Sequence, residues 1–311
     1  MKAVRYHRYG DSDVLAHEEA PRPVAGAGQV VVKVAGTSFN PVEVAIRAGY
    51  LGQVFPLVFP HVPGIDVAGT VAEVGEGVTG WRAGDAVVAF LPMNADGAAA
   101  EYVAVPGEVL AAAPRTVELA DAAALPAVGL TAWQALFDHA ALNAGQSVLI
   151  NGAGGAVGGY AVQLAAQAGA LVTATASARS ADRVRGHGAD RVVDYTATPL
   201  ARAVAGQRFD VVLNLVATSP EETAVLVDLV ADGGVFVSTT TPGVEDAGRE
   251  VRAVRVFARS DAAQLAELVN RVDAGRLRID VAARRPLADL AAVHDEAVSG
   301  RLAGKTVLTP A

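Results

Sequence analysis

The feature that most constrains the fold is a glycine-rich turn between a short apolar segment and a helix-forming segment. Ser147–Asn151 is predicted to be a strand, Gly152–Gly158 contains four glycines, and Gly155–Ala168 is predicted to be a helix. A tight glycine turn at a helix N-terminus directs free backbone N–H groups and the positive end of the helix dipole at a pyrophosphate. The sequence therefore predicts a strand–turn–helix unit that binds a dinucleotide.

The glycine spacing differs from the strict G-x-G-x-x-G pattern. Counted from Gly152, the sixth position is Val157, whereas Gly152, Gly155 and Gly158 follow one another at three-residue intervals. An ordinary turn is the alternative, but the strand before the turn and the helix after it favour phosphate binding. The candidate cofactor-binding residues here are Gly152, Gly155, Ala156, Val157 and Gly158.

The next predicted strand, Leu171–Ala176, bears on which dinucleotide is used. An NAD site places Asp or Glu about 20 residues after the glycine turn, where the carboxylate binds the ribose 2′-hydroxyl. Here the first carboxylate after the strand is Asp182, and Ser177 and Arg179 precede it. A hydroxyl and a guanidinium suit a 2′-phosphate, which Arg binds through two hydrogen bonds. The sequence favours NADPH over NADH; a solvated arginine at a helix start is the alternative.

Predicted strands and helices are unevenly distributed. The N-terminal third has short Val-rich strand candidates between Gly and Pro, which is typical of a barrel-like β domain: Met1–Tyr6, Gln29–Val34, Asp66–Val74, Gly84–Phe90 and Ala99–Val105. From Asp121, which we expect to cap a helix, strands alternate with helices, as in a doubly wound parallel sheet. The predicted final strand, Lys305–Leu308, is expected to return to the first domain.

Composition excludes several classes of function. The 33 acidic and 25 basic residues give a net charge of −8, which disfavours nucleic acid and anionic membranes as partners. The chain has no cysteine, so it has no disulfides, thiolate zinc sites, iron–sulfur clusters or cysteine nucleophiles. Residues 1–10 lack the apolar core of a signal peptide, and no apolar run approaches the ~18 residues of a membrane span. We expect a soluble cytoplasmic protein.

Motifs along essentially the whole chain carry a family resemblance. Besides the glycine turn, they are Asn40–Gly49, Pro63–Gly69, Gly84-Asp85, Leu130-Thr131, Gly188–Tyr195 and Gly304–Leu308. Together they resemble the zinc-independent quinone oxidoreductase branch of the medium-chain dehydrogenase/reductase superfamily, the branch that includes zeta-crystallin.

The resemblance implies an α/β protein of two domains. Residues 1–122 and 277–311 would form a barrel-like, GroES-like, mainly β catalytic domain. Residues 123–276 would form a Rossmann domain that binds NADPH in a doubly wound parallel sheet, with the active site in the cleft between the domains. A homodimer is common in this family.

The resemblance also implies roles for individual residues. The 2′-phosphate would be surrounded by Ser177, Arg179 and Tyr195. The nicotinamide half of the cofactor would lie along the backbone of Val216, Thr239, Thr240 and Thr241.

Three residues are candidates for the catalytic site. Tyr50 has the place of a cleft-lining tyrosine of the family, so we expect it to donate a hydrogen bond to the substrate or to orient it. Asn40 can donate its amide N–H to the acceptor oxygen or the ribose, and Thr131 is expected near the nicotinamide. The structural alternatives are a packing tyrosine, a turn residue before Pro41 and a helix-interior threonine.

The chain also differs from the zinc alcohol dehydrogenases of the same superfamily at the positions of their zinc ligands. Those enzymes have Cys in the region of Phe39-Asn40, His at the place of Ile65, and four further cysteines around a structural zinc; this chain has none of these ligands. Its six histidines show no ligand-like spacing, so we expect no metal. Asp66 is expected to have a structural hydrogen-bonding role. Surface arginines without a binding role are expected at Arg183, Arg185 and Arg191.

These observations predict a zinc-independent enzyme that transfers hydride from NADPH to a quinone or an α,β-unsaturated carbonyl. Without a Lewis-acid zinc to stabilise an alkoxide, hydride delivery to an acceptor that is already electrophilic fits better than alcohol oxidation. Two alternatives stay open: an enoyl reductase of a biosynthetic pathway, and a non-catalytic NADPH-binding sensor or structural protein.

Overall fold

The computed structural model describes residues 1–310, and contacts within it divide the chain into two units. The first unit comprises Met1–Ala127 and the chain from Ser260 onward, and the second comprises Val128–Arg259. The second boundary thus lies before helix α7 (Ala262–Asp273), not after it at 276/277 as expected. The reason is that Asp273 accepts hydrogen bonds from the backbone N–H groups of Arg115 and Thr116 in the first unit. The catalytic and cofactor-binding roles of the two units stay predictions.

The first unit is built on a seven-stranded sheet in the order β14-β15-β3-β4-β5-β7, with β6 also paired to β3. In β3, β4, β5 and β6, short Val-rich segments form strands because alternate residues enter a shared apolar core. The strands are β3 (Gln29–Ser38), β4 (Asp66–Val74), β5 (Ala86–Phe90), β6 (Tyr102–Pro106), β7 (Ala111–Ala112), β14 (Ala283–Pro286) and β15 (Thr306–Thr309). A separate antiparallel pair consists of β1 (Lys2–Arg5) and β2 (Ala16–Glu19).

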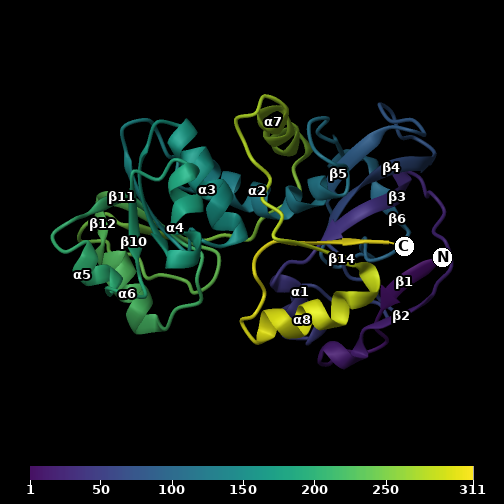
Figure 1. Cartoon of the computed structure of the whole chain (residues 1–311), viewed down its shortest axis with the longest axis horizontal. Coiled ribbons are helices and arrows are strands. Elements are labelled where there is room, and N and C mark those ends of the chain that lie inside the picture. Colours follow the sequence, from purple (N-terminus) through teal and green to yellow (C-terminus); the bar gives the residue numbers. More distant parts are fainter. Residues whose placement is uncertain (311) are drawn as a thin grey trace. The chain divides into compact units, whose positions relative to one another are not determined.

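The last strand returns to the first unit, as the sequence predicted. Strand β15 is antiparallel to β3, with Val307 opposite Ser38 and Leu308 opposite Thr37. Figure 1 shows the yellow C-terminal end of the chain beside the purple and blue strands of this unit. The pairing places residues near position 305 next to residues near position 40, which matters for the buried site described below.

Short helices connect the strands of the first unit. The α-helices are α1 (Val42–Arg47), α7 and α8 (Leu290–Val298), and the 3₁₀ helices are η1 (Ser12–Val14), η2 (Gly107–Val109), η3 (Asp121–Ala124) and η5 (Leu287–Asp289). The prediction that Asp121 is a helix N-cap is wrong, because Ala120 caps η3. The Asp121 carboxylate instead accepts a hydrogen bond from the Arg284 guanidinium (Oδ1 to Nε, 2.7 Å).

The second unit is a six-stranded parallel sheet in the order β10-β9-β8-β11-β12-β13. This is the strand order of a Rossmann fold, in which the order reverses between the first and fourth strands, here β8 and β11. The strands are β8 (Ser147–Asn151), β9 (Leu171–Ala176), β10 (Arg191–Asp194), β11 (Phe209–Asn214), β12 (Val230–Ser238) and β13 (Arg252–Arg255). Figure 1 labels β10, β11 and β12 with the helices α3 to α6 around them.

Helices follow most strands of the second unit. They are α3 (Ala156–Gln167), α4 (Ala178–Gly186), α5 (Leu200–Ala203) and α6 (Pro220–Asp228). Helix α2 (Pro126–Trp133) crosses the boundary between the units and continues into the π-helix η4 (Gln134–His139). No helix within residues 1–310 is long and apolar enough to cross a membrane.

Candidate functional site

The glycine turn of the second unit follows strand β8 directly, as the sequence predicted. Gly152 has a φ of +96°, a left-handed conformation that glycine adopts without strain. Its N–H donates to Thr175 Oγ1 at 2.9 Å, and the Ala153 N–H donates to the Thr175 carbonyl. The turn is therefore fixed against the end of the neighbouring strand β9.

The N-terminus of helix α3 leaves backbone donors unused. Gly155, the N-cap residue, has no side chain to cap the helix, and its own N–H bonds the Gly152 carbonyl. Within residues 1–310, the N–H groups of Ala156, Val157 and Gly158 donate no hydrogen bond. Three free donors at the positive end of a 12-residue helix suit a phosphate group.

Two of the glycines are needed for different reasons. A Cβ on Gly158 would lie 2.3 Å from the Gly152 carbonyl oxygen, so only glycine lets the helix approach the turn this closely. A Cβ on Gly155 would meet only the Gly152 carbonyl oxygen, at 3.4 Å. The space beside Gly155 is thus free of other protein atoms, as a bound pyrophosphate requires.

Polar side chains join the carboxyl ends of the central strands. Asn151 ends β8 and Asn214 ends β11, and the Asn151 amide donates to the Asn214 Oδ1 at 2.9 Å. Thr175 Oγ1 donates to the Asn151 Oδ1 at 2.9 Å. This chain of hydrogen bonds crosses the point where the strand order reverses, which is where doubly wound sheets bind ligands. The sequence prediction missed both asparagines, although Asn151 ends a predicted strand.

The structure brings the residues predicted for the nicotinamide half together around Asn214. The Val216 carbonyl accepts from Asn214 Nδ2 (3.0 Å) and from Thr240 Oγ1 (2.7 Å), and the Thr239 N–H donates to the Asn214 carbonyl. Thr241 Oγ1 accepts from the Thr218 N–H and donates to the Thr218 carbonyl. A Cβ on Gly152 would lie 2.7 Å from a Val216 methyl, so this group also borders the glycine turn.

The residues predicted around the 2′-phosphate lie at the ends of adjacent strands. Ser177 follows β9 and is the N-cap of α4, and Arg179 is exposed in the first turn of that helix. Within residues 1–310, the Arg179 guanidinium has no hydrogen bond or ion pair. Tyr195 follows β10, the neighbour of β9, and is 56 % exposed. No carboxylate takes the place that an NAD site requires.

Arg183 was predicted to be a surface arginine without a binding role, but its guanidinium contacts the glycine turn. Its side chain is half-buried, and Nη2 donates to the Gly154 carbonyl of the glycine turn at 2.7 Å. The available signal was its position one helical turn after Arg179, which places both guanidinium groups on one face of α4.

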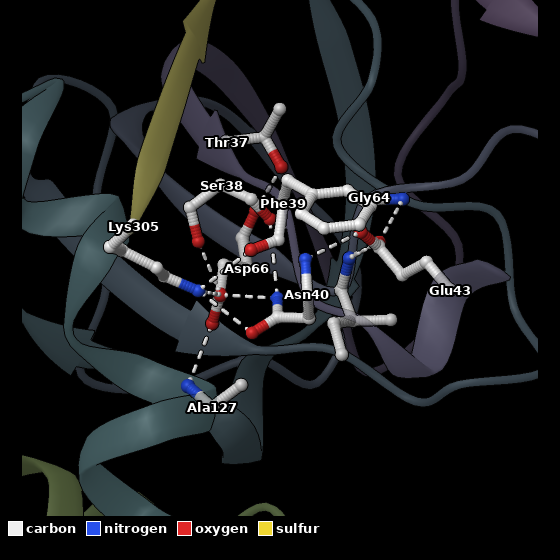
Figure 2. Close-up of polar contacts among 10 residues, drawn as sticks. Thr37, Ser38, Phe39, Asn40, Glu43, Gly64, Asp66, Ala127 and Lys305 are labelled. Atoms are coloured by element: carbon white, nitrogen blue, oxygen red, sulfur yellow. Dashed lines mark hydrogen bonds and ion pairs between the residues drawn. The ribbon is translucent and has the colours of Figure 1, made fainter. Parts of the chain in front are cut away.

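The first unit contains a buried polar cluster, which we define as Ser38, Asn40, Asp66 and Lys305 (Figure 2). Asp66 is fully buried; its Oδ2 accepts from Ser38 Oγ (2.6 Å), Asn40 Nδ2 (2.8 Å) and Lys305 Nζ (3.2 Å). Its Oδ1 accepts from the Ala127 N–H at 2.7 Å. The structural role predicted for Asp66 is confirmed.

Lys305 uses all three of its ammonium hydrogens inside the protein. Besides Asp66, it donates to Asn40 Oδ1 (2.7 Å) and to the Phe39 carbonyl (3.2 Å). A buried charge needs this degree of compensation. Lys305 therefore joins the C-terminal strand to the end of β3.

Glu43, in helix α1, lies next to this cluster and is also buried (Figure 2). Its Oε1 accepts from the N–H groups of Gly64 and Ile65 (2.9 and 3.0 Å), and its Oε2 accepts from the Asn40 N–H (3.0 Å). Burial raises the pKa of Glu43 to about 7, and the Asp66 carboxylate adds to this, whereas the backbone donors and Lys305 oppose it. Glu43 thus ties residues 64 and 65 to residue 40.

The three predicted catalytic residues have different surroundings. Tyr50 lies in the turn after α1 and is 85 % exposed. Asn40 donates its amide hydrogens to Ser38 O and Asp66 Oδ2, so none remains for a substrate. Thr131 is half-buried in helix α2. The structure thus favours the structural alternative for Asn40, and Tyr50 has its side chain available.

Two protein-family models match the chain. Residues 26–115 match the alcohol dehydrogenase GroES-like domain, and residues 187–308 match a family described as zinc-binding dehydrogenase. The residues present at the positions that the resemblance gives for zinc ligands, Phe39-Asn40 and Ile65, do not fit zinc. They include no Cys or His, and the Asp66 carboxylate is already hydrogen-bonded inside the protein. Residues 1–310 contain no group of three or more His, Cys, Asp or Glu side chains that could hold a metal ion.

Similar proteins cover the chain from end to end. It is 32 % identical to the chloroplast envelope quinone oxidoreductase homolog of Arabidopsis thaliana, over 100 % of this chain and 98 % of the relative. It is also 32 % identical to the 2-methylene-furan-3-one reductase of Solanum lycopersicum, over 100 % of this chain and 79 % of the relative. The solved quinone oxidoreductase of Coxiella burnetii superposes with a TM-score of 0.88 at 28 % identity, with 99 % of each chain covered. The chain therefore belongs to the medium-chain dehydrogenase/reductase superfamily, in its zinc-independent quinone oxidoreductase branch.

Proposed function

We propose that this protein is an NADPH-dependent, zinc-independent reductase that transfers hydride to a quinone or an α,β-unsaturated carbonyl. The observation that carries the proposal is the glycine turn, where three free N–H groups at the start of α3 stand beside a sheet of Rossmann strand order. Such a turn binds the pyrophosphate of a dinucleotide.

The preference for NADPH rests on the residues after β9. Ser177 and the exposed Arg179 stand where a dehydrogenase specific for NAD carries a carboxylate. Because a guanidinium attracts a 2′-phosphate and a carboxylate repels it, this turn favours NADPH. Tyr195, at the end of the adjacent strand, supplies an aromatic side chain near the same position.

Two observations support the proposed class of hydride acceptor: the side chains of the buried polar cluster in the first unit, and the names of two similar proteins. In the buried polar cluster, the Lys305 ammonium group occupies the oxygens of Asp66 and Asn40 that could otherwise bind a metal ion. We therefore assign no step in which a metal ion activates the acceptor. One similar protein is named as a quinone oxidoreductase homolog and another as a reductase of a methylene furanone, a conjugated enone. Both names describe acceptors that take hydride without metal activation.

The chain has few groups to assist the chemistry. When bound, NADPH supplies the hydride, and negative charge then develops on the acceptor oxygen. The exposed Tyr50 hydroxyl is our proposed hydrogen-bond donor to that oxygen, and Thr131 is proposed to orient the substrate or the nicotinamide. Asn40, whose amide is fully used, is assigned a supporting role.

The experiment is an acceptor panel. Initial rates of NADPH oxidation are measured with 1,4-quinones, short enones and 2-enoyl thioesters, with a chelator present throughout. Turnover of quinones or enones supports the proposal, whereas turnover confined to enoyl thioesters identifies a biosynthetic enoyl reductase. Tight NADPH binding without turnover of any acceptor would identify a binding protein.

We also propose a cytoplasmic homodimer, as is common in the family. Light scattering on the purified protein tests the assembly, and a mass equal to one 31.6 kDa chain would contradict it.

A further inference from the structure

The glycine turn is held from two sides, by strand β9 and by helix α4. On one side, Thr175 binds the N–H groups and side chains at the end of β8, as described above. On the other, helix α4 contacts Gly154: the Arg183 Nη2 donates to the Gly154 carbonyl at 2.7 Å. Nothing in the glycine motif itself requires this second contact.

The contact with α4 is close along a whole helical turn. A Cβ on Gly154 would lie 2.5 Å from Ser180 Oγ, so Ser180 already packs against the turn. Arg183 lies three residues further along the helix and reaches the same residue from its half-buried position. The geometry fixes the orientation of the 154–155 peptide, because its carbonyl is the acceptor.

That peptide precedes the donors of the proposed pyrophosphate site. The Gly155 N–H belongs to the same peptide plane as the Gly154 carbonyl, and it bonds the Gly152 carbonyl. The free N–H groups of Ala156, Val157 and Gly158 follow immediately. Holding the carbonyl of residue 154 therefore sets the direction in which α3 begins.

We infer that Arg183 is a positioning residue, which holds the glycine turn in the conformation that binds the pyrophosphate of either nicotinamide dinucleotide. This inference rests on the proposed cofactor site and assigns different roles to two arginines of helix α4. Arg179, with its guanidinium free, discriminates through the 2′-phosphate, whereas Arg183, with its guanidinium bonded to the turn, supports the part that NADPH and NADH share.

The test compares three variants: Arg183→Met, Arg183→Lys and the matched control Arg185→Met. Arg185 is an exposed residue of the same helix, paired with Asp182 at 2.7 Å, and does not bond the turn. Dissociation constants for NADPH and for NADH are measured by calorimetry. We expect Arg183→Met to weaken the binding of both dinucleotides equally, by about tenfold, which corresponds to about 1.4 kcal/mol. Arg183→Lys should recover part of the loss, and Arg185→Met should stay within about twofold of the parent protein.

A second readout needs no cofactor. Amide hydrogen exchange of Gly152, Ala153 and Gly155, whose N–H groups are hydrogen-bonded in the turn, should be faster in Arg183→Met than in Arg185→Met, with the thermal midpoints of the two variants alike. Equal affinities and equal exchange in these two variants would overturn the inference. A loss confined to NADPH would also overturn it and make Arg183 a ligand of the 2′-phosphate. If the parent protein binds neither dinucleotide, the proposed function itself fails, and the exchange data then show separately whether Arg183 still orders the turn.

Discussion

At the scale of single residues, Asp66 and Lys305 form a buried ion pair in the first unit. Both are buried, and each satisfies its hydrogen-bonding capacity inside the protein. Removing one partner of a buried pair leaves an uncompensated charge, which costs more than the pair itself contributes. The pair is therefore a sensitive probe of this part of the fold.

Replacing Lys305 by Met should lower the free energy of unfolding by roughly 3–5 kcal/mol, because Asp66 is left charged and buried. Chemical denaturation measures the loss. Lys33→Met is a matched control, since Lys33 is an exposed residue of β3, and its effect should stay within about 0.5 kcal/mol. Similar small effects of both substitutions would show that the buried pair is not needed for stability.

Glu43 predicts a pH dependence of stability. Its pKa in the folded protein is raised to about 7 from 4.5, so the folded state binds the proton more tightly than the unfolded state does. Its contribution to the free energy of unfolding therefore falls as the pH rises from about 4.5 to about 7. The difference in unfolding free energy between the parent protein and Glu43→Gln should fall by roughly 1–3 kcal/mol over that range. A difference that is constant with pH would contradict the raised pKa.

Sequence reasoning assigned a structural role to Asp66 but found no partner for it. The two residues of the ion pair are 239 positions apart and meet only because β15 pairs with β3. The contact of Asn151 with Asn214, 63 positions apart, likewise depends on the neighbouring places of β8 and β11 in the sheet. Such contacts are set by tertiary structure, whereas the glycine turn is encoded within a few consecutive residues.

At the scale of secondary-structure elements, the start of α3 is the element on which the proposed cofactor site depends. Its three free N–H groups exist because glycines at 155 and 158 let the chain turn tightly and approach itself. Any side chain at position 158 would displace the helix from the Gly152 carbonyl.

Gly158→Ala should therefore weaken dinucleotide binding by at least about tenfold, with a loss of stability on the order of 1–3 kcal/mol. Gly159→Ala provides the control, because its Cβ would meet only the His187 ring at an ordinary 3.5 Å. Fluorescence titration with NADPH compares the two variants. Comparable affinities would mean that the close approach of helix and turn is not required for binding.

Elements with strong local signals were predicted best. The predicted bounds of β4, β8 and β9 match the structure, because these are short β-branched or apolar runs bounded by turn residues. Helix α1 and strand β14 were missed: α1 has only six residues, and the sequence of β14, Ala-Arg-Arg-Pro, contains no apolar alternation.

At the scale of the whole molecule, the chain combines a unit with a buried, fully hydrogen-bonded polar cluster and a unit in which we propose an anion site at the start of α3. The first unit offers Tyr50 as an exposed polar group, and its described residues include no group of three or more side chains that could hold a metal ion. The second unit offers the glycine turn and Arg179. The proposed function therefore requires NADPH as the source of the hydride and an acceptor that needs no metal.

The most direct test is the ratio of kcat/KM for NADPH to that for NADH, measured with a 1,4-quinone in the presence of a chelator. The parent protein should prefer NADPH by at least about tenfold, and Arg179→Ala should bring the ratio close to one by losing activity with NADPH only. Equal use of both dinucleotides by the parent protein, or equal losses for both in Arg179→Ala, would contradict the assignment of the 2′-phosphate site. Loss of all activity on chelation would contradict the zinc-independent mechanism.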